Sequence, residues 1–269
     1  MTESPPDHLT AVTPFQKLSA VTRAETHRLL GKGGVPVLVI VAITAALTSG
    51  VLTTLIIKSL TPEPTLIMAT APIEAGAFMS ALVLSIAAVF AVGRDHTGQL
   101  GLALSLTPKR DRLFVARILS WAALTAGVTI FITIVIAGLG LVLSDGKFAG
   151  PGLFCVAVSV VGSTSMVLIA VALAHIVGRA FGAVLLLVGV NLVLPLGVFA
   201  VGAMIPEQAA EAVSAVMNAT PTPLYMRAIS GSTIEDLGLG HLMGGQLGLA
   251  VWVLVLGGVA LTVFRRRAL

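Results

Sequence analysis

Few residues of this chain have the type and spacing that chemistry requires. A phosphate-binding loop needs a glycine, four further residues, Gly-Lys and then Ser or Thr, because its backbone amides hold phosphates and its hydroxyl binds Mg²⁺. In the nearest stretch, Gly140 to Phe148, the first glycine is one position too early and Phe148 stands where the hydroxyl is needed. The chain is therefore not expected to hydrolyse ATP alone, and we assign no catalytic residue.

The histidines and the single cysteine form no metal-binding or nucleophilic pattern. Cys155 lies in an apolar run and excludes both a disulfide framework and a multi-cysteine metal site. The histidines are scattered over the tail, the loops and the ends of apolar segments, where we expect them to be solvated: His8, His27, His96, His175 and His241. No metal ligand and no Ser-His-Asp group is predicted.

The composition places the chain in a membrane. Hydrophobic residues make up 57% of the 269 residues and charged residues only 10%, whereas a soluble domain has about a quarter charged residues. The mean hydropathy is +1.04. The net charge is +4, but the cations flank apolar segments and no basic face carries aromatic residues, so we expect no nucleic-acid partner.

Six apolar segments have the length of about 20 residues that crosses a ~30 Å hydrocarbon core. We therefore predict an all-α membrane protein in which both termini lie on one side. The predicted spans are residues 35–57, 71–92, 118–143, 152–177, 180–204 and 242–264.

The distribution of lysine and arginine predicts the orientation. Thirteen of these cations fall on the side of the two termini, and only Lys58, Lys147 and Arg227 fall on the other. Cytosolic loops are rich in Lys and Arg, so we expect both termini in the cytosol and a multi-pass protein of the inner (plasma) membrane.

The chain before the first span divides into two parts. Residues 1–14 are polar and contain prolines, and we expect a disordered cytosolic tail. Residues 15–31 predict a helix lying on the membrane surface, and a solvated cytosolic helix is the alternative. Gly31, Gly33 and Gly34 would then turn the chain into the bilayer. The apolar arc of this helix holds Phe15, Leu18, Thr22, Thr26 and Leu29, and its basic face, expected to meet lipid headgroups, holds Lys17, Arg23, His27 and Arg28.

The stretch Val92 to Arg117 is the one long charged cluster between two spans. It contains five cations and two acids. Between them, Leu100, Leu102, Leu104 and Leu106 alternate as in a strand, but on a helix they cover one continuous arc, and Pro108 would end it. We favour a short helix, because a lone strand would leave its edge groups unpaired.

In its layout the chain resembles a permease subunit of an ABC transporter of the ABC-2 exporter type. That family has a glycine after the second span, a proline about ten residues later, then basic residues and a cation that opens the third span. The matching residues are Gly98, Gln99, Leu100, Pro108, Lys109, Arg110 and Arg117, with Arg94 and Asp95 standing where the family often has an acid and Gln99 where Thr or Ser is usual. Glu25 followed by Arg28 resembles the acid and cation of the family's elbow helix.

The resemblance implies the partners. The helix between spans two and three would be a coupling helix that docks on a separate ATPase subunit, which binds ATP and Mg²⁺. Two such ATPases, a second permease copy or a sister permease, and membrane lipid would complete the assembly. The charges of Arg94, Asp95, Lys109 and Arg110, beside His96, would orient the docked helix. Lipid anchoring is the alternative reading of these cations, and we prefer it for Arg112 and Arg117.

The remaining candidates concern the pathway and its outer face. Glu74 is the one charged residue within a predicted span, and Asn191 and Pro195 share the fifth span. We expect Asn191 to bond a neighbouring helix rather than a substrate. From Pro206 a helix is predicted outside the membrane, followed by an irregular segment from Thr220 to Gly240, which either covers a pathway or, as we prefer, packs against the bundle.

These observations together favour the permease of an ATP-driven exporter for an amphipathic drug, peptide or lipid. A secondary, ion-coupled transporter is the main alternative, and the lack of a buried acid near the midplane argues against it. A membrane-embedded enzyme or scaffold is a third reading, and the lack of a catalytic grouping argues against that.

Overall fold

The computed structural model describes residues 18–31, 34–60, 66–98, 110–143, 153–194, 196–197, 200, 214–229 and 234–267. Within these ranges every regular element is a helix. Lipid offers backbone groups no hydrogen-bond partner, so a helix is the natural form for long apolar segments. The elements are α1 (Leu18–Gly31), α2 (Gly34–Leu60), α3 (Leu66–Gly98), α5 (Arg110–Leu143), α6 (Leu153–Val177), α7 (Ala180–Val188), η1 (Gly189–Val193), α10 (Pro221–Ile229) and α11 (Ile234–Arg267).

Among the residues that the structure describes, five helices are long and apolar enough to cross a membrane, namely α2, α3, α5, α6 and α11. They coincide with the first four predicted spans and with the last, so the predicted all-helical fold is confirmed, and the long apolar helices are those expected of a membrane-embedded protein. The predicted fifth span, residues 180–204, is described in part, and within it α7 passes into the π-helix η1. Of the residues up to 204, Pro195, residues 198–199 and residues 201–204 lie outside the described part of the chain.

The boundaries around the charged stretch differ from the prediction. Helix α3 extends to Gly98 and α5 begins at Arg110. Arg94 and Asp95 therefore belong to the last turns of α3, and Arg112 and Arg117 to the first turns of α5, rather than to a loop. Asp95 and Arg117 have ionic partners within the bundle, as shown below, so the helices can continue past the apolar segment.

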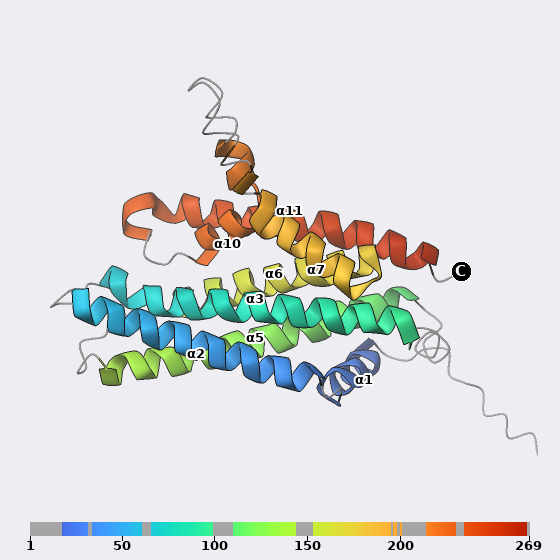
Figure 1. Cartoon of the computed structure of the whole chain (residues 1–269), viewed down its shortest axis with the longest axis horizontal. Helices are drawn as coiled ribbons and strands as arrows, with labels where there is room; N and C mark the ends of the chain where they lie inside the picture. The colour runs from blue at the N-terminus through green and yellow to red at the C-terminus, as the bar shows by residue number, and fades with distance from the viewer. Residues whose placement is uncertain are drawn as a thin grey trace, which may run out of the picture.

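The long helices run side by side (Figure 1). Small residues allow them to pack closely. The core between α2 and α3 contains Ala42, Ala46, Ala77 and Ala81, all almost fully buried. A Cβ added at Gly50 of α2 would lie 2.6 Å from Ile136 Cδ1 of α5. Close packing of this kind is how helices associate where lipid removes the hydrophobic driving force.

A sharp turn connects α6 to α7. Gly178 has φ 72°, a conformation that favours glycine, and its N–H donates to the Ala174 carbonyl at 2.9 Å, which closes the end of α6. The turn sets α7 against α3 so closely that a Cβ at Gly93 would lie 2.6 Å from Ala180 Cα.

The predicted irregular segment after Thr220 is wrong, because Pro221–Ile229 forms helix α10. Pro221 and Pro223 stand in the first turn, where a missing N–H costs no helical hydrogen bond. The buried side chains of Leu224, Tyr225, Ala228 and Ile229 recur at helical spacing. Helix α10 packs on α6 and α11, and a Cβ at Gly245 of α11 would lie 2.6 Å from the Ala228 nitrogen.

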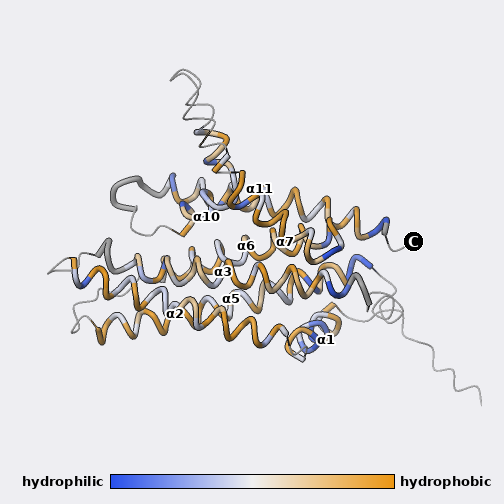
Figure 2. Tube along the Cα trace, viewed as in Figure 1, coloured by the Kyte–Doolittle hydropathy of each residue, from blue (hydrophilic) through white to orange (hydrophobic). Residues whose placement is uncertain are grey.

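Charged residues gather at one end of the bundle (Figure 2). We call it the cationic end; it holds α1, the beginnings of α2, α5 and α7, and the ends of α3, α6 and α11 (Figure 1). Here Arg265 of α11 donates from Nε and Nη2 to Asp111 of α5, each at 2.7 Å. At the opposite end Lys58 Nζ donates to the Leu143 carbonyl at 2.7 Å, which joins the ends of α2 and α5.

Candidate functional site

The candidate site is the cationic end, where α1 lies across the ends of the long helices (Figure 1). His96 and Gly98 occupy the last turn of α3, and Arg110 begins α5. The predicted coupling helix between them lies outside the described residues, with Leu100, Leu102, Leu104, Leu106, Pro108 and Lys109; so does Phe15 of the predicted elbow.

Four charged side chains from three helices form one buried ion-pair network beside this segment. Arg28 of α1 donates from Nε to Glu25 Oε2 at 2.8 Å, and its Nη2 reaches Asp95 Oδ2 of α3 at 2.5 Å. Arg117 of α5 donates from Nε to Glu25 Oε1 at 3.1 Å, and its Nη2 lies 3.4 Å from Asp95 Oδ2. Each arginine thus pairs with both acids.

Burial makes this network energetically important. Arg117 is 1% exposed, Asp95 2% and Glu25 5%. An isolated charge in such surroundings would lose its hydration at a cost of several kcal/mol, but two cations here balance two anions. Burial lowers the pKa of Arg28, yet the hydrogen bonds from Asp95 and Glu25 outweigh it and raise this pKa above its ordinary value. Arg28 therefore stays charged at any pH the protein meets.

Three sequence predictions are corrected by this geometry. Arg117 does not anchor a span to lipid, because its guanidinium is enclosed by Glu25 and Asp95. Asp95 does not present its carboxylate at the surface for a docking partner, because the two arginines surround it. Arg28 does not belong to a headgroup-facing basic face, since it turns inward to the same acids.

The buried face of α1 also differs from the predicted arc. Val21, Glu25 and Leu29 are buried, while Leu18 is exposed and Thr22 and Thr26 are partly buried. Hydroxyl groups fasten this helix to α5 as well. Thr26 Oγ1 donates to Ser120 Oγ at 3.1 Å, and Ser120 Oγ donates to the Thr22 carbonyl at 3.3 Å.

A signal for the network existed in the sequence. Val21, Glu25 and Leu29 are spaced four residues apart and share one helix face. An acid between two aliphatic residues on a buried face requires a cation on the element it packs against. The sequence contained this requirement, but it could not say which of the many arginines supplies the cation.

His175 is buried rather than solvated as predicted. Its ring lies 5.2 Å from the Phe114 ring and 5.4 Å from the Phe264 ring, measured between centroids, and it is fully enclosed. These three residues join α5, α6 and α11 just inside the cationic end. The chain turns back at Gly178, just after α6 ends. His175, although it is near the end of a span, therefore becomes part of the core.

The interior candidates lie toward the opposite half of the bundle. Asn191 of η1 accepts a hydrogen bond from Thr222 of α10 at 3.0 Å and donates to the Leu187 carbonyl at 2.8 Å. It thus bonds a neighbouring helix, as expected. Glu74 of α3 is partly buried, and its negative charge acts on the Tyr225 phenol, which also hydrogen-bonds Ser163 at 3.1 Å.

Among the residues that the structure describes, no three His, Cys, Asp or Glu side chains are grouped to hold a metal ion. No protein-family model matches the chain, and no curated protein matches it significantly. The functional reading therefore depends on the sequence pattern and on the geometry of the cationic end.

Proposed function

We propose that this chain is the membrane-spanning permease subunit of an ATP-driven exporter of the ABC-2 type. It contributes six spans and pairs with a second permease, so that an amphipathic drug, peptide or lipid moves outward along the interface of the two permeases, driven by a separate ATPase. In this proposal α1 serves as the elbow helix, and residues 99–109 include the leucines of the coupling helix that the sequence predicts. The protein would lie in the inner membrane with both termini in the cytosol.

The observation that carries the proposal is the ionic contact between α1 and the two helices that flank residues 99–109. Asp95 lies four residues before that segment and Arg117 eight residues after it, and both pair with α1. A force applied to the segment by a docked ATPase would reach α3, α5 and α1 together. A rigid connection of this kind is what couples a domain movement to a membrane bundle.

Because the Asp95 carboxylate is buried, the expected docking surface for an ATPase is smaller than the sequence predicted. With Asp95 and Arg117 enclosed by α1, the contact with an ATPase is left to the segment itself and to exposed charges beside it. Arg94 is exposed at the end of α3. The leucines of residues 100–106 would fill an apolar socket, and such buried apolar anchors supply most of the energy of an interface.

The test is co-purification with a P-loop ATPase encoded beside the gene. Changing Leu100, Leu104 and Leu106 to Asp is expected to abolish both the complex and the stimulation of ATPase activity. Matched control changes at the opposite end, Leu60→Asp and Val142→Asp, replace aliphatic residues that are each 75% exposed. These controls should keep the complex.

Two outcomes would count against the proposal. If the leucine variant binds and stimulates the ATPase as well as the parent, residues 99–109 are not the docking element. If no ATPase associates and transport instead follows an ion gradient, the chain is a secondary transporter, and Glu74 becomes the first residue to test as its ion-binding group.

A further inference from the structure

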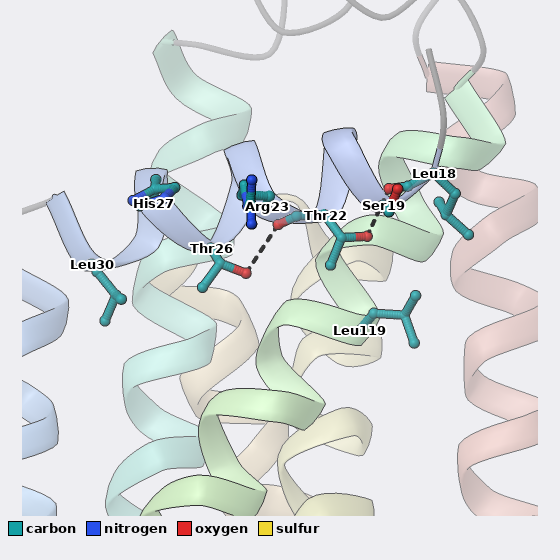
Figure 3. A pocket seen from close by; sticks show the side chains of 8 residues that line it. All are labelled: Leu18, Ser19, Thr22, Arg23, Thr26, His27, Leu30 and Leu119. Atoms are coloured by element: carbon teal, nitrogen blue, oxygen red, sulfur yellow. Dashed lines mark hydrogen bonds between the residues drawn. The ribbon is translucent and has the colours of Figure 1, made fainter. Parts of the chain in front are cut away.

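An open groove of about 610 Å³ lies in the corner between α1 and α5 (Figure 3). In the figure α1 crosses above α5, and Thr22 and Leu30 point down from α1 toward the level of Leu119. The groove is lined by Leu18, Ser19, Thr22, Arg23, Thr26, His27, Leu30 and Leu119. The groove lies beside the buried face of α1 that carries Glu25, but on a different side of the helix.

We propose that this groove binds one anionic phospholipid, with its phosphate on Arg23 and an acyl chain against Leu119. The proposal requires that the bundle lies in a membrane, which its five long apolar helices indicate, and does not depend on the proposed transport function. The occupant follows from the distribution of polar and apolar groups in the groove.

The polar lining residues recur at one spacing. Ser19, Arg23 and His27 are four residues apart, so they form one stripe of α1. None of the eight lining residues is acidic, and Glu25, the only acid of α1, is turned into the network on the buried face. Within the described part of the chain, no acid pairs with Arg23. A headgroup with a net negative charge fits this stripe, whereas the ammonium group of a zwitterionic headgroup would meet repulsion.

The apolar lining continues into a path for an acyl chain. Leu119 is followed on the same exposed stripe of α5 by Ala123, Gly127 and Ile130, spaced three or four residues apart. Ala123 and Gly127 are small, and a Cβ added at Gly127 would meet nothing within 4 Å. The stripe therefore offers an exposed apolar path from the groove along the span.

The hydroxyl groups of Thr22 and Thr26 are compatible with an acyl chain in the groove. Thr22 Oγ1 donates to the Leu18 carbonyl at 3.0 Å and Thr26 Oγ1 to the Thr22 carbonyl at 2.9 Å, as the dashed lines show (Figure 3). Each hydroxyl thus has a hydrogen-bond acceptor within α1. The floor of the groove can meet hydrocarbon without leaving these donors unpaired.

The test measures lipid bound to the purified whole chain by native mass spectrometry, after incubation in mixed micelles containing phosphatidylglycerol or phosphatidylcholine. Phosphatidylglycerol should bind preferentially. Arg23→Gln should lower its binding about five-fold, while Arg266→Gln, a cation exposed at the same end, should not. Leu119→Trp should block the groove, while Leu254→Trp on the exposed face of α11 should leave binding unchanged.

Three results would overturn the proposal. Equal binding of the two lipids would exclude recognition of the negative charge. Equal losses in Arg23→Gln and Arg266→Gln would show general attraction to the cationic end rather than a site. A chain lacking residues 2–14 that binds more phosphatidylglycerol than the whole chain would show that its own N-terminal segment fills the groove.

Discussion

The Arg117 guanidinium on α5 donates a 3.1 Å hydrogen bond to the Glu25 carboxylate on α1, across 92 residues of sequence. This contact joins a helix that lies across the bundle to a helix that spans it. Because Arg28 makes the corresponding contact with Asp95 of α3, the two pairs form a single unit. Movement of any one of these three helices must disturb the other two.

Removing one partner of this network should be costly. Arg117→Met leaves two buried acids with one cation, and we expect the free energy of unfolding to fall by about 3–5 kcal/mol. The double change Glu25→Leu with Arg117→Met removes a balanced pair and should cost clearly less than the single change. The measurement is the thermal unfolding midpoint of the purified chain in detergent.

The exposed ion pair between Arg265 and Asp111, also at the cationic end, provides a control for Arg117→Met. Arg265 and Asp111 form two hydrogen bonds, but each side chain is 54% exposed. Arg265→Gln should therefore lower stability by no more than about 1 kcal/mol. If Arg117→Met proves as mild as Arg265→Gln, the ionic network does not stabilise the fold.

The network should also matter for coupling, if the proposed function holds. The variant with Glu25→Gln and Arg117→Gln keeps the docking segment intact but weakens its connection to α1. ATPase binding should persist, while ATP-driven transport in vesicles falls about 5-fold or more. Transport at the parental level, in a variant that binds the ATPase normally, would separate α1 from the coupling path.

Two adjacent glycines offer a sharp test of the packing between α10 and α11. A Cβ at Gly245 would lie 2.6 Å from the backbone nitrogen of Ala228, and backbone cannot yield easily. Gly245→Ala should cost about 1–3 kcal/mol of stability. Gly244→Ala meets nothing within 4 Å and should be neutral or stabilising by up to about 1 kcal/mol. Equal effects on unfolding would contradict the close approach.

The single tyrosine of the chain allows a direct titration. Burial raises the pKa of Tyr225 above its ordinary value of 10.0, the Ser163 hydrogen bond lowers it somewhat, and the charge of Glu74 raises it. The folded protein should therefore show no tyrosinate absorbance near pH 10. Because the pKa of Tyr225 is higher in the folded than in the unfolded chain, the neutral buried phenol contributes fully to the stability of the fold below pH 10. This contribution decreases as the pH rises above 10.

A variant extends this measurement. Ser163→Ala removes the hydrogen bond that favours the tyrosinate, so the pKa of Tyr225 should rise further. Unfolding in denaturant should return the titration to the ordinary value in both proteins. Ionisation near pH 10 in the folded chain would show that the phenol is not enclosed between α3, α6 and α10.

The sequence alone determined the class of protein and most of its helices. Runs of about 20 apolar residues leave a chain in lipid no alternative to helices, because every backbone donor must be satisfied within its own segment. The positions of α2, α5, α6 and α11 follow from this local rule. Helix α1 ends at Gly31 and α2 begins at Gly34, two of the glycines at which the sequence predicts a turn into the bilayer.

The tertiary structure decided what the charged and polar residues do. Arg112 and Arg117 look alike in the sequence, yet Arg117 is enclosed by acids from two other helices and Arg112 is partly exposed. Likewise, Pro221–Ile229 gives a weak local helix signal and becomes helical where Gly245 and Gly248 make room for it on α11. Charge pairing and close packing act between segments far apart in the sequence, so only the assembled bundle specifies them.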